Sequence, residues 1–199
     1  MLNPLSPHHA ALAPRLRAAF GNEFFAGDAD VLLSNSDDYL ARSAVLNRNA
    51  AAMAAFLQKH KDAHAGSPVR RVLYPTLLPD RANIDAVLRR PTGDFPAPGY
   101  GCLLSVDFVS LEAARLFYDE LKFYPGPHLG AHRTLSLCFN TLAYGKTPEE
   151  AEYHAGYGLV QESVRISAGL EAEQDLLDTL QAALDFTVAE LAKKAAGSA

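Results

Sequence analysis

The stretch Ser163-Val-Arg-Ile-Ser-Ala-Gly-Leu-Glu-Ala-Glu-Gln-Asp-Leu-Leu-Asp-Thr-Leu-Gln-Ala-Ala-Leu-Asp185 decides the fold, because one kind of secondary structure passes into another within it. Val164 and Ile166 alternate with polar residues, which is the period-two pattern of a half-buried strand. Gly169 ends that pattern. Apolar residues then recur every three or four positions, as in an amphipathic helix, at Leu176, Leu177, Leu180, Ala183 and Leu184. The stretch therefore predicts a strand, a glycine turn and a helix, and the carboxylates of Glu171, Glu173 and Asp175 suit the start of that helix.

Arg165 is placed on the strand face opposite Val164 and Ile166. One interpretation is a solvated or surface-paired side chain, because antiparallel sheets commonly have one face in water. The other is that Arg165 points into a cleft and holds a carboxylate with two parallel hydrogen bonds. The pattern alone leaves both interpretations open.

The string S-V-R-I-S-A-G-L-E, followed by a D-L-L helix, resembles the C-terminal signature of the Cys/Met-metabolism enzymes that use pyridoxal phosphate. In that family the motif reads approximately L-I-R-(L/I)-S-(V/T)-G-(I/L)-E, and the nearest type is the fungal cystathionine γ-synthase. The segments N-P-L-S-P-H, V-L-Y-P and G-C-L-L-S are also similar to family segments. The resemblance covers nearly the whole chain, but only the C-terminal part of the family. It implies that Arg165 binds the α-carboxylate of an amino-acid substrate.

We expect an α+β fold with an antiparallel sheet of about four strands and helices packed on one side, as in the C-terminal domain of cystathionine γ-synthase-like enzymes. Strands and helices that do not alternate regularly favour this class. A chain of 199 residues with 49% hydrophobic residues can bury one core, so residues 1–199 are expected to form a single domain. Its predicted parts are an N-terminal segment (1–35), a long helix (36–61) and an α+β lobe (69–199).

Composition excludes several classes of protein. A net charge of −5 gives no basic surface for nucleic acid, and no apolar run reaches the length of a membrane span. Cys102 and Cys138, with no short-spaced pair, suit a reducing compartment, so the cytoplasm is the expected location.

His60 and His64 have the spacing of two metal ligands on one helical face, but no third ligand is evident. We expect solvated histidines there and no metal site.

The segment Gly126-Pro-His-Leu-Gly-Ala-His-Arg-Thr-Leu135 aligns with the family's S-L-G-G-x-E-S-L segment at the mouth of the active site. It departs from that pattern, since His128 stands where the family usually has serine. His128 and His132 are candidate general acids or bases near neutral pH, and the alternative is an ordinary polar loop. The predicted substrate-binding residues are Arg165, Tyr100, Tyr124 and Arg133.

The family's cofactor-binding half, with its Schiff-base lysine, lies upstream of the matching part. Lys122 stands in K-F-Y-P-G, which superficially resembles the motif around that lysine, but its neighbours place it at the end of a helix. A positioned lysine is required to bind pyridoxal phosphate covalently. We therefore expect no cofactor on this chain alone, and pyridoxal phosphate only if a lysine-bearing partner chain supplies it.

Three functions follow. The first is a repurposed, pyridoxal-phosphate-independent enzyme or binder for a carboxylate-bearing or enolate-like metabolite, in which Arg165 grips the acid and His128 or His132 moves protons. The second is a trans-acting subunit of a split γ-replacement enzyme. The third is a non-catalytic remnant that dimerises. A homodimer, or a partner protein, is expected to cover an exposed apolar face.

Overall fold

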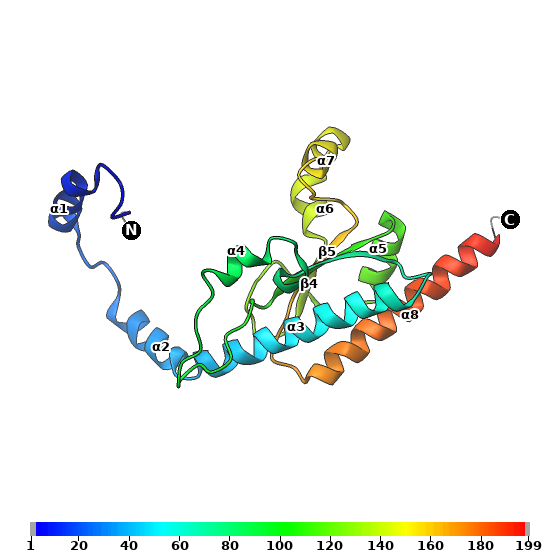
Figure 1. Cartoon of the computed structure of the whole chain (residues 1–199), viewed down its shortest axis with the longest axis horizontal. Coiled ribbons are helices and arrows are strands. Elements are labelled where there is room, and N and C mark those ends of the chain that lie inside the picture. Colours follow the sequence, from blue (N-terminus) through cyan, green and yellow to red (C-terminus); the bar gives the residue numbers. More distant parts are fainter. Residues whose placement is uncertain (1–2, 198–199) are drawn as a thin grey trace. The chain divides into compact units, whose positions relative to one another are not determined.

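The computed structural model describes residues 3–197, which contain eight α-helices and a five-stranded mixed sheet (Figure 1). The chain divides into two compact units, Met1–Tyr39 and Leu40–Ala199. Within the described residues, none of the helices combines the length and apolar character needed to cross a membrane.

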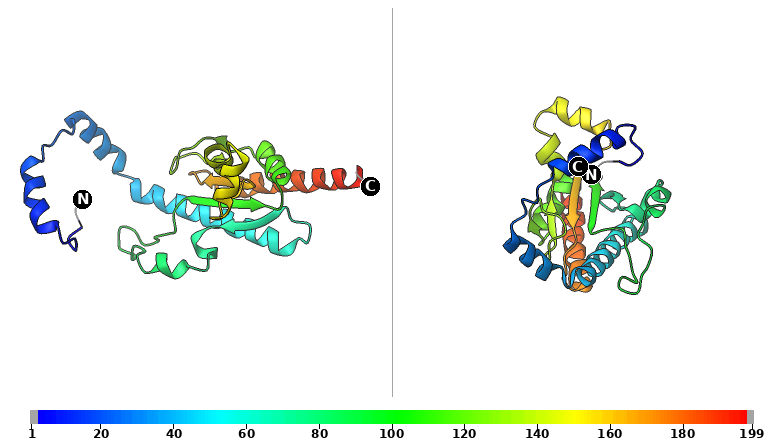
Figure 2. Two further views of the ribbon diagram at one scale, coloured as in Figure 1. Left: turned by 90° about the horizontal axis from the view of Figure 1, so that it is seen from above. Right: turned by 90° about the vertical axis from the view of Figure 1, so that its left-hand side faces the viewer.

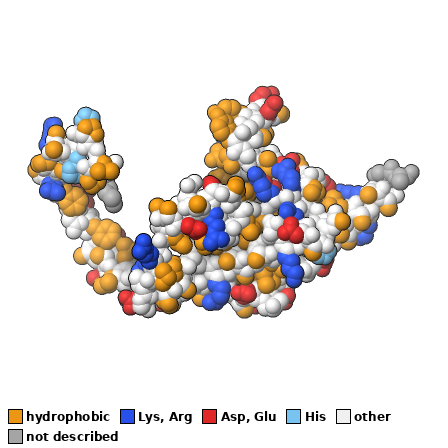
Figure 3. Space-filling view, in the orientation of Figure 1, with side chains coloured by type: hydrophobic (Ala, Val, Ile, Leu, Met, Phe, Trp, Pro, Cys, Tyr) orange, Lys and Arg blue, Asp and Glu red, His pale blue; other side chains and the backbone are white. Residues whose placement is uncertain are grey.

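The first unit contains α1 (His9–Ala19) and α2 (Ala26–Ser36), and neither helix has a buried residue. The α1 helix continues through Pro14. Hydrophobic side chains gather on the surface of this unit (Figure 3). Its large exposed apolar residues are Leu5, Leu12, Leu16, Phe20, Phe24, Phe25, Val31, Leu32, Leu33 and Tyr39.

The second unit is built on a sheet in the order β1-β2-β5-β4-β3. Its strands are β1 (Val69–Leu73), β2 (Leu103–Phe108), β3 (Tyr124–Pro125), β4 (Leu135–Leu137) and β5 (Ser163–Ser167). The first four strands in this order pair antiparallel, as predicted, whereas β3 pairs parallel with β4. The sheet is therefore mixed and has five strands rather than about four. The two residues of β3 are too few to show a period-two pattern.

Helices lie on both sides of this sheet. One side carries α3 (Tyr39–Ala63), α5 (Leu111–Glu120) and α8 (Glu173–Gly197), whose buried residues join the sheet in one hydrophobic core. From the other side project α6 (Phe139–Tyr144) and α7 (Pro148–Ala155), as Figures 1 and 2 show. The prediction of helices on one side only is therefore wrong for α6 and α7. Two shorter elements, η1 (Pro75–Leu77) and α4 (Arg81–Asp85), follow β1.

The alternation along β5 sorts its side chains as predicted. Val164 and Ile166 are fully buried in the core, whereas Arg165 is only partly buried and lies on the opposite face. Across the sheet, Ser105 of β2 and Leu137 of β4 are its register partners. The guanidinium is thus carried at the middle of the sheet, between two paired strands.

The turn after β5 is fixed by contacts that only glycine permits. A Cβ on Gly169 would lie 2.4 Å from the backbone atoms Arg133 C and Thr134 N. Glu171, which the sequence placed at the start of a helix, instead accepts hydrogen bonds from the Thr134 main-chain N–H (2.6 Å) and hydroxyl (2.8 Å). The α8 helix begins two residues later, with Glu173 and Asp175 in its first turn.

Asn49 of α3 holds the same turn from the core side. Its amide Nδ2 donates to the main-chain oxygens of Gly169 and Glu171, both at 2.9 Å. The side chain is fully buried. Its burial depends on partners more than one hundred residues away.

His60 is buried, so the prediction of a solvated histidine is wrong at this position. Its ring stacks on His64 with 4.4 Å between centroids, and its Nδ1 lies 2.9 Å from Ser67 Oγ. Burial and the neighbouring His64 lower the pKa of His60, while Asp185 of α8 opposes that shift. Among the described residues, no cluster of three metal-ligating side chains is present.

This burial predicts a loss of stability in acid. Because the folded state disfavours the charged imidazole, the unfolded chain binds the His60 proton more readily. The contribution to folding is complete above the ordinary histidine pKa of about 6.5 and declines as pH falls through the lowered value. We expect His60→Gln to reduce the pH dependence of the urea midpoint between pH 7.5 and pH 5. The exposed His128→Gln variant is the control, and an equal change in both variants would contradict this account.

Candidate substrate-binding site

Arg165 is held in place by one hydrogen bond and one aromatic ring. Its Nη2 donates to the main-chain oxygen of Pro127 at 2.9 Å, and its Cζ lies 4.5 Å from the ring centroid of Phe139. Partial burial lowers the pKa of Arg165 from its ordinary value, but an arginine remains charged at any physiological pH. Since no other hydrogen bond to the described residues engages the guanidinium, its remaining N–H groups can bind an anion.

A cavity of about 310 Å³ lies over the guanidinium, between the outer face of the sheet, α6 and the loop with Gly158 and Leu159. Polar side chains from three elements face it, namely Arg165, Ser105, Ser163, Asn140 and Tyr144. The rest of the lining is mainly apolar and comes from Leu73, Leu103, Phe139 and Leu159, together with Gly158. The arrangement suits a small acid, because one cation and a few polar groups fix its orientation while apolar walls enclose its carbon atoms.

The turn that carries the two predicted histidines does lie against β5. Besides the bond from Arg165 to Pro127, the main-chain N–H of Gly130 donates to Ser167 Oγ at 3.1 Å, and Leu170 N–H donates to His132 O at 3.0 Å. Gly130 has a φ of +71°, a conformation that favours glycine. The imidazoles of His128 and His132 are exposed, and neither makes a hydrogen bond to another side chain of the described residues.

Tyr124 and Arg133 form a pair of their own. Tyr124 lies on β3, and the Cζ of Arg133 is 4.9 Å from its ring centroid. Neither residue is part of the lining around Arg165. The two predicted substrate-binding residues thus contact each other at the edge of the sheet.

Tyr100 also lies outside that lining. Its hydroxyl donates to Asp85 Oδ1 at 2.7 Å and accepts from Arg81 Nη2 at 2.9 Å. Both partners belong to α4. The hydroxyl is therefore occupied by a local ion-pair network.

The described lysines lie outside the lining of the Arg165 cavity. None of the ten residues around the Arg165 cavity is a lysine. Lys122, which resembles the Schiff-base lysine in its sequence context, is exposed and pairs with Glu120 at 3.5 Å. The remaining lysines are exposed or, in the case of Lys61, paired with Asp62 at 2.9 Å.

The Cys138 thiol is not activated as a nucleophile. Burial raises the pKa of Cys138 to about 11, with a smaller contribution from Asp119, so its thiol stays protonated. Cys102 packs beside the core, and its sulfur accepts a weak hydrogen bond from Ser167 Oγ at 3.8 Å.

Sequence reasoning missed Phe139, Asn140 and Tyr144, which complete the cavity. Phe139 and Asn140 lie within a largely apolar stretch, residues 135–142, that the structure divides between β4 and α6, and Tyr144 follows that stretch. The period-two alternation of β2 was a usable signal for Ser105, because it puts this residue on the same face as Arg165.

Comparison with known proteins shows sequence similarity to one enzyme family. Residues 39–185 match the family model described as Cys/Met metabolism PLP-dependent enzyme. The chain is 36% identical over 184 residues to a cystathionine gamma-synthase-like protein of Aspergillus thermomutatus, covering 92% of this chain and 30% of that protein. It is 31% identical to the cystathionine gamma-synthase of Neurospora crassa, covering 92% of this chain and 27% of the relative. The chain thus spans about a third or less of the length of these relatives.

Solved structures of a cystathionine gamma-lyase and a cystathionine gamma synthase have a similar fold. A cystathionine gamma-lyase from Lactobacillus plantarum, complexed with L-serine, aligns with a TM-score of 0.65 over 92% of this chain and 44% of that one, at 21% identity. The cystathionine gamma synthase of Xanthomonas oryzae pv. oryzae, in complex with cystathionine, aligns with a TM-score of 0.57 over 75% of this chain and 35% of that one, at 28% identity.

Proposed function

Because the chain belongs to the Cys/Met-metabolism family of pyridoxal-phosphate-dependent enzymes, we propose that it binds a carboxylate-bearing small molecule through Arg165. In this proposal Leu40–Ala199 corresponds to the C-terminal domain of a cystathionine γ-synthase-like enzyme. The observation that carries it is a guanidinium with unused N–H groups, fixed by Pro127 and Phe139 beneath a cavity of about 310 Å³.

The carboxylate of the bound ligand would replace water at the Arg165 guanidinium and would not have to break an existing ion pair. No carboxylate side chain is among the residues that line the cavity, so the charge of Arg165 is not neutralised locally. The apolar lining lowers the local dielectric constant, which strengthens an ion pair with a bound acid. Ser105 and Ser163 offer hydroxyl groups to other polar atoms of the ligand.

We also propose that His128 or His132 transfers a proton to or from the bound molecule. His128 directly follows Pro127, whose oxygen accepts the Arg165 hydrogen bond, so the backbone of this exposed histidine lies close to the guanidinium. Such a group can accept or donate a proton near neutral pH. Because no lysine lines the cavity, the proposal assigns no step to pyridoxal phosphate.

A second function, a subunit that completes an enzyme with a lysine-bearing partner, is supported by a separate observation. The helices α1 and α2 bury no residue and expose large apolar side chains, which is typical of a surface that a partner or a second copy covers. Mixing the chain with such a partner should then create an absorbance of bound pyridoxal phosphate that neither protein shows alone. The first function predicts no such absorbance.

The proposed binding is tested by calorimetry with L-cystathionine and L-serine as probes. We expect Arg165→Gln to raise the dissociation constant about 10- to 100-fold, because it removes a charge-assisted, two-point contact. Arg165→Lys should recover only part of the affinity, since an ammonium cannot form two parallel bonds.

Arg133→Gln is the matched control, because this arginine is nearby but stacks on Tyr124 outside the cavity. Its dissociation constant should stay within about twofold of the unmodified protein. Equal losses in the Arg165 and Arg133 variants, or no loss in either, would rule out the proposed contact.

A further inference from the structure

The free edge of β1 borders a second cavity. β1 is the last strand of the sheet, and within residues 3–197 no strand pairs with its outer edge. A groove of about 570 Å³ lies here, lined by Arg70, Arg71 and Val72 of β1, Gln58 and Lys61 of α3, Leu77, Gly158 and Val160. It shares only Gly158 with the cavity over Arg165.

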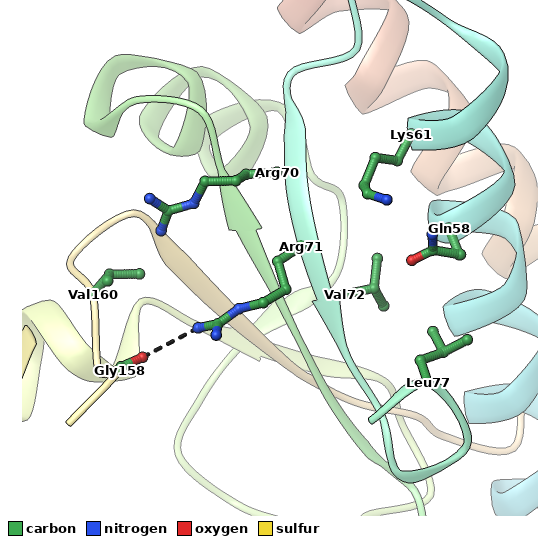
Figure 4. Close-up of a pocket in the computed structure, with 8 residues that line it drawn as sticks. All are labelled: Gln58, Lys61, Arg70, Arg71, Val72, Leu77, Gly158 and Val160. Carbon is green, nitrogen blue, oxygen red and sulfur yellow. Dashed lines mark hydrogen bonds between the residues drawn. The ribbon is translucent and has the colours of Figure 1, made fainter. Parts of the chain in front are cut away.

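The groove spans both faces of the edge strand. Figure 4 shows Arg70 and Arg71 extending toward the loop with Gly158 and Val160, whereas Lys61 and Gln58 lie on the other side of β1. Because residues on both sides of β1 line the same groove, the groove passes over the outer edge of this strand. Alternate residues of an edge strand direct their N–H and C=O groups outward, so main-chain hydrogen-bonding groups are available along it.

A β-bulge places the two arginines together. The register with β2 shifts between Val69 and Arg71, which leaves Arg70 as an extra residue. Arg71 is fixed, because its Nε and Nη2 lie 2.8 and 2.7 Å from Asp107 Oδ2 and its Nη2 also donates to Gly158 O at 3.3 Å. Arg70 is 3.9 Å from the same oxygen, and 47% of its side chain is exposed.

The groove is positive in a chain whose net charge is −5. Its cations are Lys61, Arg70 and Arg71, and Lys59 lines an adjoining hollow that shares Gln58 and Leu77 with it. The carboxylates paired with these groups are Asp62 and Asp107. The balance of charge therefore favours an acidic ligand and disfavours a second copy of β1, which would bring the same arginines face to face.

We propose that this edge binds an extended acidic peptide segment of a partner protein, which pairs with β1 as an additional strand. Main-chain hydrogen bonds to the edge supply a sequence-independent part of the binding, and alternate side chains supply specificity. Side chains on one face of the peptide meet Arg70, so they are acidic. Side chains on the other face meet Val72 and Leu77, so they are apolar, with Lys61 at the margin.

The probe is a fluorescein-labelled heptapeptide in which glutamate and valine alternate, measured by fluorescence anisotropy. We expect saturable binding that weakens with rising salt and weakens at least tenfold in Arg70→Glu and Lys61→Glu. Lys122→Glu reverses an exposed charge outside the groove and should change the dissociation constant less than twofold.

Two control peptides separate strand pairing from simple charge attraction. A peptide with lysine in place of glutamate should bind at least tenfold more weakly. A glutamate–valine peptide that is N-methylated at alternate residues keeps its charges but cannot donate main-chain hydrogen bonds on one edge, and it should also lose at least tenfold. Unchanged binding of the N-methylated peptide, or binding unaffected by Arg70→Glu, overturns the proposal. So does concentration-dependent dimerisation of the free chain that Arg70→Glu alters, since that would make a second copy the occupant.

Discussion

Replacing Gly169 by alanine is expected to cost about 3 kcal/mol or more of folding free energy. The new Cβ would lie 2.4 Å from two backbone atoms, Arg133 C and Thr134 N, and 2.3 Å from Glu171 Oε2. Backbone atoms held by the Glu171–Thr134 hydrogen bonds cannot move aside cheaply, and overpacking of this kind typically costs about 1 to 3 kcal/mol, occasionally more. Urea unfolding followed by circular dichroism measures this loss.

Gly66→Ala is the matched control for that variant. No atom lies within 4 Å of its added Cβ, so we expect a change of less than about 1 kcal/mol, in the stabilising direction. If both alanine variants unfolded at the same urea concentration, the close approach at Gly169 would not be what fixes the turn after β5.

The second large effect is expected at the Arg71–Asp107 pair. Asp107 is fully buried, and its Oδ1 has no hydrogen-bond partner among the described residues, so Arg71 supplies most of the compensation for its charge. Arg71→Met would leave a buried carboxylate nearly unpaired, which costs about 3 to 5 kcal/mol. Urea unfolding again provides the measurement.

Arg70 allows a matched comparison, because it is adjacent in sequence but 3.9 Å from the same carboxylate and half exposed. Arg70→Met should cost less than about 1 kcal/mol. The double variant Arg71→Met/Asp107→Asn should recover part of the loss, because the uncompensated charge is gone. Equal costs for the two arginine variants would show that Asp107 does not depend on Arg71.

The strand, glycine turn and long helices were predictable because their signals are local. Val164 and Ile166 alternate along one strand, and the leucines of α8 repeat along one helix, so neither pattern needs knowledge of a distant partner. The role of Arg165 was predictable only as one of two interpretations, because periodicity fixes the face of a strand but not what covers that face.

The features that were missed depend on residues far apart in the chain. The burial of Asn49 depends on its hydrogen bonds to Gly169 and Glu171, which lie far away in the sequence. The burial of His60 depends on Ser67 and α8, and the spacing of the histidines along their own helix does not predict it. The cavity over Arg165 likewise needs α6 folded across the outer face of the sheet.

The same limit applied to the other predicted site residues. Tyr100 was predicted to bind substrate together with Arg165, and its hydroxyl is bound to Asp85 and Arg81. Tyr124 and Arg133 were grouped with it by the turn they flank, and they stack on each other instead. Shared position near a motif therefore did not predict shared lining of one cavity.

The most direct test of carboxylate binding is the NMR signal of the Arg165 Nε–H group during a titration with L-serine. The account predicts that this signal shifts in a saturable way and becomes protected from exchange with water, while the Arg133 Nε–H signal stays unchanged. L-Serinamide, which lacks the carboxylate, should produce neither change at the same concentrations. An Arg165 signal that does not respond to L-serine while other signals of the chain shift would contradict the account.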